Sequence, residues 1–380
     1  MIGIPGEGRG TASFLETIDM PTRHRSNRFL ISSLLAGTAA SLMMAGCASS
    51  RRLDAPSAGP DADADVMRVL VWNVLHGSND VTDGPEKALA VIRESNADVV
   101  LMQESYDIDG DRPLLGAWLA GQMGWNQWQG ESPHLCVLTR FDIVDRFTHE
   151  PWHAVGATLV DDRSREFIAW SIWLDYRDYI TRRLRDEPDM SDADLLESEF
   201  VRSSRLPQVE RIIERLEGLG HLKASVPVMV GGDFNTPSHL DWTLDTTRVF
   251  KRRRDLDLPV SVAMAEAGFT DTFRTVHPNP VQRPGITWSP MFRTSGGKAQ
   301  GFERIDRLYV HEPVGPDRGD PDEAADPGSH PPSWSLVPVG GVVYPLVWED
   351  DATPVEDLVF PSDHGAVLIE LVWRAGSPAG

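Results

Sequence analysis

Short apolar runs alternate with amphipathic stretches along the chain from residue 66 onward. Nearly every run ends in polar residues, and the runs combine β-branched and aromatic side chains, which is the pattern of β-strands. The pattern predicts strands over residues 67–72, 99–102, 135–138, 167–174, 226–230, 304–310 and 366–372.

Apolar residues at helical spacing predict helices between these strands. One helix covers residues 85–95, and a second, with Ser191 before its first turn, lies in the charged stretch 177–205. Pro207 begins a third helix, which we expect to pack beneath the strand that follows it. Residues 311–333 are rich in Pro, Gly and Asp and predict a long exposed loop.

The order of these elements indicates the fold class. Many strands and few helices, without a regular βαβ repeat, favour an α+β sandwich over a Rossmann or barrel arrangement. One domain over residues 66–374, followed by a tail at 375–380, accounts for the whole pattern.

Composition and charge narrow the functional classes. The 380 residues include 57 acidic and 36 basic side chains, for a formal charge of -21, which argues against binding through a broad cationic face. We therefore do not expect non-specific coating of nucleic acid. The cysteines are Cys47 and Cys136, so a disulfide framework and zinc-finger spacing are excluded as well.

The N-terminal segment has the features of an export signal. Basic residues at 23–28 precede an apolar segment, 29–44, that is too short to span a membrane comfortably. We predict a signal peptide over residues 1–46. Met20 precedes the basic residues and is a second candidate start, which would leave residues 1–19 untranslated.

The end of this segment, Met44-Ala45-Gly46-Cys47, resembles the lipobox of bacterial lipoproteins. The resemblance implies that Cys47 carries a lipid and becomes the mature N-terminus. Residues 47–65 are small, acidic and contain proline, which is typical of a flexible linker. We therefore expect an exported lipoprotein, anchored to a bacterial membrane and facing the periplasm or the cell exterior.

Polar residues that could take part in catalysis or metal binding follow five of the predicted strands. Each of them alone is explained by a loop that faces water. In order along the chain they form a recurring set, within the blocks Val71-Trp72-Asn73-Val74, Leu101-Met102-Gln103-Glu104, Gly232-Asp233-Phe234-Asn235-Thr236-Pro237, Arg304-Ile305-Asp306-Arg307-Leu308 and Pro361-Ser362-Asp363-His364.

With these blocks the chain resembles the endonuclease/exonuclease/phosphatase superfamily, which includes pancreatic-type deoxyribonucleases, abasic-site endonucleases, neutral sphingomyelinases and inositol polyphosphate 5-phosphatases. The resemblance covers residues 66–374. It implies a four-layer α/β/β/α sandwich of two packed mixed β-sheets, as in deoxyribonuclease I. It also implies metal-dependent hydrolysis of phosphoesters.

The resemblance assigns a metal side of the site. Glu104 is expected to be the principal Mg²⁺ ligand, with Asn73 beside it and Asp363 on the same side. Carboxylate and amide oxygens suit a hard divalent cation, and Mn²⁺ or Ca²⁺ would also be accepted.

The remaining motif residues are expected to act on water and phosphate. Asp233 would orient and deprotonate the attacking water, and Asn235, in an extended segment, would point the same way. His364 would contact a phosphate oxygen as the imidazolium, and Asp306 would hold its ring and raise its pKa.

One position departs from the family pattern. Many members have Asn-x-His-Leu-Asp where this chain reads Ser171-Ile172-Trp173-Leu174-Asp175, and indole cannot deliver a proton to a leaving group. Trp173 would then pack against substrate or in the core, and Tyr176 or Tyr179 could replace the missing acid. His76 and His239 adjoin the motif loops and are further candidate substrate contacts.

Three functions are consistent with the sequence. The leading hypothesis is a Mg²⁺-dependent phosphodiesterase or phosphatase outside the cytoplasm, with a lipid, nucleotide or nucleic-acid phosphoester as substrate. The alternatives are a secreted or surface endonuclease or exonuclease of deoxyribonuclease type and a non-catalytic binding lipoprotein on the same scaffold. The sequence indicates no protein partner, and we expect a monomer.

Overall fold

The computed structural model describes residues 65–106, 114–250, 253–314 and 334–375. The predicted signal peptide, Cys47 and nearly all of the linker lie outside the described residues, as do residues 376–380 of the predicted tail and most of the predicted loop at 311–333. The contacts divide the chain after Ala58, and the unit from Gly59 to Gly380 contains every described residue. That unit is described by itself.

One mixed sheet, sheet A, has six strands within the described ranges, in the spatial order β13-β14-β1-β2-β4-β3. The pair β1 and β2 is parallel, and the other neighbouring pairs are antiparallel. The strands are β1 (Val66–Asn73), β2 (Val99–Gln103), β3 (Asn126–Trp128), β4 (Cys136–Thr139), β13 (Trp334–Tyr344) and β14 (Ala366–Ala375).

The second mixed sheet, sheet B, also has six strands in the part of the chain that the structure describes, in the order β5-β6-β7-β8-β12-β9. Here β7 and β8 are the parallel pair. The strands are β5 (Asp142–His149), β6 (Ala154–Val160), β7 (Glu166–Trp173), β8 (Val228–Asp233), β9 (Phe269–Asp271) and β12 (Asp306–His311).

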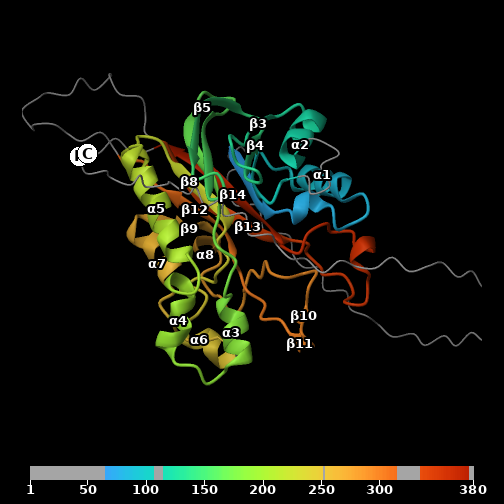
Figure 1. Ribbon diagram of the computed structural model, residues 1–380. Helices are drawn as coiled ribbons and strands as arrows, with labels where there is room; N and C mark the ends of the chain where they lie inside the picture. The colour runs from blue at the N-terminus through green and yellow to red at the C-terminus, as the bar shows by residue number, and fades with distance from the viewer. Residues whose placement is uncertain (1–64, 107–113, 251–252, 315–333, 376–380) are drawn as a thin grey trace, which may run out of the picture. The chain divides into compact units, whose positions relative to one another are not determined.

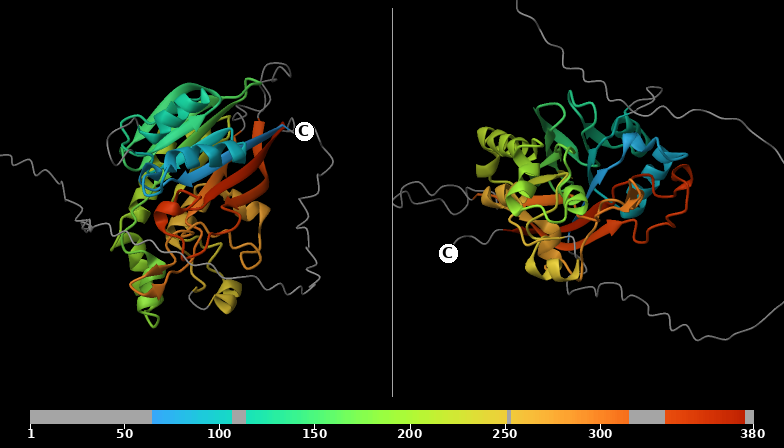
Figure 2. Two further views of the ribbon diagram at one scale, coloured as in Figure 1. Left: turned by 90° about the vertical axis from the view of Figure 1, so that its right-hand side faces the viewer. Right: turned by 60° about the horizontal axis from the view of Figure 1, so that its bottom comes forward.

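Helices cover the outer face of each sheet, which gives four layers (Figure 1). Helices α1 (Gly84–Ser95) and α2 (Leu115–Met123) pack on sheet A, and α5 (Arg205–Gly218) and α7 (Pro259–Glu266) pack on sheet B. Figure 2 (left) shows α1 and α2 in front of sheet A. Apolar clusters fill the space between the sheets and the space beneath each helix pair. The predicted α/β/β/α sandwich is confirmed.

Alternation along the strands sends successive side chains to different layers. In β1, Val69 and Val71 enter the core between the sheets, whereas Leu70 and Trp72 pack beneath α1 and α2. Because both faces are covered, the strand reads as a continuous apolar run. Asn73 is the last residue of β1 and takes an inward-facing position between the sheets.

A helical arm beside the sandwich has an apolar cluster of its own. The arm contains α3 (Ile180–Asp186), α4 (Asp192–Phe200) and α6 (Leu244–Val249), at the bottom of Figure 1, and its apolar cluster includes Leu184 and Leu195. Ser191 caps α4, as predicted, by accepting a hydrogen bond from the Asp194 N–H. The smaller elements are η1 (His76–Ser78), η2 (His221–Lys223), α8 (Thr272–Val276), β10 (Thr294–Ser295), β11 (Lys298–Ala299) and η3 (Val355–Asp357).

The structure confirms each predicted strand and helix with shifts at the ends. Helix α5 begins at Arg205, so Pro207 lies within its first turn, where its missing N–H costs no helical hydrogen bond. Strand β12 continues through His311, the first residue of the predicted loop. Among the described residues, no helix has the length and apolar character needed to cross a membrane.

Candidate active site

The ends of the central strands bring polar side chains together between the two sheets. Asp233 ends β8, and the antiparallel register pairs it with Asp306, the first residue of β12. Paired residues on neighbouring strands point to the same face, so both carboxylates face sheet A. The Asn73 side chain of sheet A reaches across and donates a hydrogen bond to Asp233.

A glycine in β8 lets the sheets approach closely beneath this cluster. A Cβ atom at Gly231 would lie 2.7 Å from side-chain carbons of both Leu101 and Val71, which belong to sheet A. Real Cβ atoms do not reach such distances, so a side chain at this position would force the sheets apart. The close approach permits the direct contact between Asn73 and Asp233.

Asn73 connects two carboxylates that come from different sheets. Its Nδ2 donates to Glu104 Oε1 at 3.0 Å and to Asp233 Oδ2 at 3.1 Å. Its Oδ1 accepts from the Leu75 N–H at 3.1 Å, which fixes the orientation of the amide because a flipped amide would place two donors together. The amide nitrogen of Asn73, rather than its oxygen, therefore faces the two carboxylates.

Glu104 adopts a left-handed backbone conformation just after β2, with φ 57°. Such a conformation is unfavourable for a residue with a side chain and persists where the surroundings fix it. Here the Glu104 carbonyl accepts from the Gly77 N–H at 2.8 Å, and Oε2 accepts from the Tyr106 hydroxyl at 3.3 Å. The carboxylate is thus held in one orientation at the mouth of the cluster.

His134 is a buried member of this site that the sequence does not single out. The Glu104 N–H donates to its Nδ1 at 3.2 Å, so Nδ1 carries no proton, and its Nε2 donates to the Trp152 carbonyl at 3.0 Å. Burial lowers the pKa of His134 to about 4, which keeps the ring neutral. The register of β2 and β4, which pairs Met102 with Cys136, places positions 104 and 134 opposite each other.

His364 and Asp306 form a buried hydrogen-bonded pair. His364 Nδ1 lies 2.9 Å from Asp306 Oδ2, and its Nε2 lies 3.8 Å from Asp233 Oδ2. Burial alone would lower the pKa of His364, but Asp306, Asp233 and Asp363 raise it well above its ordinary value. Burial raises the pKa of Asp233 to about 7, against the opposing charge of His364. The imidazolium and a carboxylate that titrates near neutrality therefore face each other.

Asp363 has a buried carboxylate oxygen without a hydrogen-bond partner. Its Oδ2 accepts from the Trp288 indole N–H at 3.3 Å, whereas Oδ1 has no donor and lies 3.9 Å from His364 Nε2. Burial and the nearby charge of Glu104 raise the pKa of Asp363 to about 6, although His364 opposes them. An orphaned buried oxygen beside a second carboxylate is the environment that a divalent cation satisfies. The residues therefore fit the metal that the sequence implies.

A second group of side chains could also bind a metal ion. Among the described residues, one ligand atom each from Asp233, Asp306 and His364 lie within 4.8 Å of one another. However, Asp306 and His364 Nδ1 already satisfy each other. We therefore favour the side of Glu104 and Asp363 for the metal.

Asn235 reaches Asp233 through a turn rather than through an extended segment, so that prediction is wrong. Asn235 is in the left-handed region with φ 51°, its N–H donates to Asp233 Oδ1 at 2.8 Å, and its Nδ2 donates to Asp233 Oδ2 at 3.0 Å. Asparagine tolerates this conformation and forms such turns with a preceding aspartate. The Asn235 amide thus lies beside the carboxylate, and its Nδ2 also donates to the Leu174 carbonyl at 2.9 Å.

The candidate substrate contacts lie in different places. Trp173 pairs with Asp233 in the β7–β8 register, packs against the core between the sheets and has a buried indole N–H without a partner. Tyr176 is 58% exposed, with its ring 5.9 Å from that of Trp173. The ring of Tyr179 is buried and lies edge-on, 5.2 Å from Trp288, which also contacts Asp363.

The two candidate histidines, His76 and His239, also lie in different places. His76 lies at the metal side, where its N–H donates to Glu104 Oε2 at 3.4 Å and its Nδ1 pairs with Asp80 at 2.8 Å. His239 binds Ser261 of α7 through Nδ1 at 2.8 Å. Because α7 covers the outer face of sheet B, the structure does not bring His239 into the inward-facing cluster.

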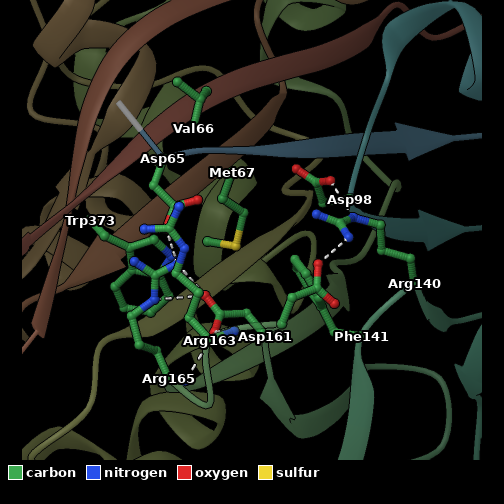
Figure 3. A pocket seen from close by; sticks show the side chains of 11 residues that line it. Asp65, Val66, Met67, Asp98, Arg140, Phe141, Asp161, Arg163, Arg165 and Trp373 are labelled. Atoms are coloured by element: carbon green, nitrogen blue, oxygen red, sulfur yellow. Dashed lines mark hydrogen bonds and ion pairs between the residues drawn. The ribbon is translucent and has the colours of Figure 1, made fainter. Parts of the chain in front are cut away.

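A cavity of about 200 Å³ lies at the opposite end of β1, beside Met67 and Trp373 (Figure 3). The arginines that line it all pair with aspartates of the same lining. These pairs join Arg140 to Asp98 and Asp162, Arg163 to Asp65, and Arg165 to Asp65 and Asp161. Its charges are compensated locally, so we assign the chemistry to the other end of the sheets.

The structure is thus a two-sheet sandwich with a carboxylate-rich site at one end of the strands, and such a set of oxygen ligands suits a divalent cation. In agreement, residues 70–364 match the model of the endonuclease/exonuclease/phosphatase family. The chain belongs to this family, whose members are typically metal-dependent phosphoester hydrolases.

The individual relatives described next are each less than 30% identical to this chain. The uncharacterized protein F14F9.5 of Caenorhabditis elegans is 29% identical over 270 residues, which are 66% of this chain and 80% of that protein. An endonuclease/exonuclease/phosphatase from Beutenbergia cavernae has a TM-score of 0.46 at 18% identity, covering 83% of this chain and 73% of that one. The TDP2 of D. rerio, solved with a single-strand DNA product, has a TM-score of 0.47 at 13% identity, covering 81% and 99%.

Proposed function

We propose that this protein is an extracytoplasmic phosphodiesterase or phosphatase that depends on Mg²⁺ and uses a water molecule activated by Asp233. The observation that carries the proposal is the hydrogen bonding of Asn73, which holds Glu104 and Asp233 on either side of one amide group. Glu104, a carboxylate that can bind a metal, and Asp233, a carboxylate that can accept a proton, are thereby fixed next to each other.

Glu104 and Asp363 would hold the metal, and Asn73 would keep Glu104 in place. The orphaned Oδ1 of Asp363 and the fixed orientation of Glu104 are the features that support this assignment. When bound, a divalent cation neutralises charge on the non-bridging phosphate oxygens.

Asp233 would accept the proton of the attacking water. Burial raises the pKa of this carboxyl to about 7, so near neutral pH it can both exist as the base and hold the proton. The Asn235 amide donates to Asp233 Oδ2 at 3.0 Å and to the Leu174 carbonyl at 2.9 Å, so it would orient the Asp233 carboxylate for the attack.

His364 would donate a hydrogen bond from Nε2 to a phosphate oxygen. Asp306 accepts the Nδ1 proton at 2.9 Å, which orients the ring and favours the charged form. The imidazolium of His364 would be held in place before the reaction. It would therefore stabilise the charge that develops on the phosphoryl oxygens without a change in its own position. Trp173 beside Asp233 cannot supply a proton, so the leaving oxygen takes its proton from another source or departs as the anion.

The location belongs to the proposal as well. The basic stretch, the short apolar segment and the lipobox that ends at Cys47 support an exported protein with a lipid at its mature N-terminus. The acidic net charge of -21 favours small or lipid phosphoesters over processive work on a polyanion.

Hydrolysis of bis(p-nitrophenyl) phosphate by the full chain, with and without EDTA, tests the proposal. We expect turnover that EDTA abolishes and Mg²⁺ restores. Plasmid DNA, sphingomyelin and a phosphate monoester, assayed in parallel, distinguish the substrate classes, and preferred cleavage of plasmid DNA would favour the deoxyribonuclease-type alternative. Absence of metal-dependent turnover on all four substrates would favour the non-catalytic binding lipoprotein.

A further inference from the structure

His134 holds the turn that carries Glu104 from two directions. Its carbonyl accepts from the Ser105 N–H at 2.8 Å and from the Ser105 hydroxyl at 3.1 Å. Its ring accepts from the Glu104 N–H through Nδ1 at 3.2 Å. The two residues at the end of β2 are therefore tied to one histidine through both backbone and side chain.

The ring contact satisfies a donor that the turn would otherwise leave unpaired. In its left-handed conformation Glu104 no longer continues the ladder of sheet A, so its N–H needs an acceptor outside the strand pairs. A partly buried N–H without an acceptor is costly, and the backbone would relax to find one. Such a relaxation would rotate the Glu104 carboxylate away from Asn73.

The ring itself is anchored on sheet B. Nε2 donates to the carbonyl of Trp152, which lies between β5 and β6, and the two rings are 4.6 Å apart. The Trp173 ring packs edge-on against the His134 ring, with 5.3 Å between the ring centroids. His134 is fully buried, so its position is set by packing and does not depend on solvent. It links the metal side of sheet A to a rigid support on sheet B.

We infer that His134 is a positioning residue that fixes Glu104 for metal binding without touching metal or substrate. The inference rests on the proposed function, because it needs Glu104 to be the ligand. Loss of a group that orients a ligand typically weakens metal affinity about 10- to 100-fold. The acceptor at Nδ1 should account for this effect, whereas the donor at Nε2 should affect stability.

Two conservative variants separate these functions of the ring. In His134→Asn the side-chain oxygen takes the place of Nδ1 and can still accept from Glu104. In His134→Gln the amide nitrogen takes the place of Nε2 and can still donate to Trp152, but no acceptor faces Glu104. His134→Ala removes both. His221 provides the control, because its buried Nδ1 also accepts an N–H, that of the Trp170 indole, in a region outside the site.

The readout is the dissociation constant for Mg²⁺, measured by calorimetry on the metal-free full chain, with thermal unfolding of the same samples. We expect His134→Gln and His134→Ala to bind Mg²⁺ about 10- to 100-fold more weakly, and His134→Asn and His221→Asn to stay within about 3-fold of the unaltered protein. Should the alanine variant fail to fold, the asparagine and glutamine pair decides.

Two results would overturn the inference alone. One is a glutamine variant that binds Mg²⁺ as tightly as the unaltered protein while that protein binds metal and hydrolyses phosphoesters. The other is an asparagine variant as impaired as the glutamine variant, since a purely structural role of the ring would affect both. If the unaltered protein binds no Mg²⁺ and hydrolyses no phosphoester, the proposed function fails and this inference fails with it.

Discussion

Two clusters of charged residues in this molecule differ in charge balance, because one has an excess of carboxylates and the other has as many guanidinium groups as carboxylates. The charged groups of the site are four carboxylates and the imidazolium of His364; the carboxylates are those of Glu104, Asp233, Asp306 and Asp363. A second cluster lies beside sheet B and contains two carboxylates and two guanidinium groups, namely Asp241, Asp271, Arg274 and Arg304.

The second cluster compensates its own charges. Arg304 binds Asp241 at 2.8 Å and Asp271 at 2.7 Å, and Arg274 binds Asp241 at 2.6 Å. Burial alone would raise the pKa of Asp241, but Arg304 and Arg274 more than offset burial and lower it. The remaining Arg274 donors bind backbone carbonyls. We regard this cluster as structural.

The site does not compensate its charges. Burial raises the pKa of Asp233 to about 7 and that of Asp363 to about 6, even with His364 nearby. The comparison shows that burial of charge alone does not mark a functional site. An excess of one sign among buried groups does, because it needs a cation or a proton that the fold does not supply.

The largest expected effect is on turnover in Asp233→Asn. Loss of the base should lower kcat by about 10²- to 10⁴-fold, because the amide cannot accept the proton of water. The unfolding free energy of the metal-free protein should fall only modestly, because relief of the excess negative charge partly offsets the hydrogen bonds that the amide would lose with Asn73 and Asn235. Steady-state kinetics and urea unfolding measure the two quantities, and retained turnover would contradict the assignment of the base.

The same substitution in the balanced cluster should cost much more stability. Asp241→Asn leaves Arg274 and Arg304 without a shared carboxylate, and breaking such a buried pair costs about 3–5 kcal/mol of unfolding free energy. Urea unfolding at neutral pH measures this loss. An Asp241→Asn variant as stable as Asp233→Asn would contradict the distinction between the clusters.

A smaller effect is expected from Glu104→Ala. The variant should need at least about 100-fold more Mg²⁺ for half-maximal rate, because loss of a ligand should exceed the about 10- to 100-fold cost of losing an outer-shell partner. Excess Mg²⁺ should partly restore the rate, because Asp363 still contributes to the site. Glu166→Ala, at an exposed position of β7, is the control. An unchanged Mg²⁺ dependence in Glu104→Ala would show that Glu104 is not the ligand.

The smallest effect is a shift in the pH profile of Asp306→Asn. His364 is expected to act as the imidazolium, so activity falls as pH rises through its pKa. The carboxylate of Asp306 helps to raise that pKa, and its loss should lower the pKa and move the alkaline limb to lower pH. Asp145→Asn, at an exposed position of β5, should leave the profile in place. An alkaline limb at its original pH in Asp306→Asn would exclude this pairing.

Prediction from sequence succeeded where packing leaves a local pattern. Strands β1 and β8 are covered on both faces, so their apolar runs and the polar residues at their ends, Asn73 and Asp233, could be read directly. It failed for β5, where exposed polar side chains resemble a loop, and for β13, where Pro338 and Gly340 interrupt the pattern at a register shift.

The parts of the site that escaped prediction depend on tertiary contacts. His134 meets Glu104 across 30 residues, and only the register of β2 and β4 places the two positions opposite each other. The left-handed conformation of Glu104 is held by hydrogen bonds from neighbouring segments. That of Asn235 arises in a local turn in which its N–H donates to Asp233.

The most direct test of whether the excess of carboxylates binds a metal is a crystal structure of the full chain, grown with Mn²⁺ and examined by anomalous scattering. The account predicts one peak between the side chains of Glu104 and Asp363, about 2.0–2.6 Å from a carboxylate oxygen of each. A peak centred instead between Asp233 and His364, or none at all in crystals that contain Mn²⁺, would contradict it.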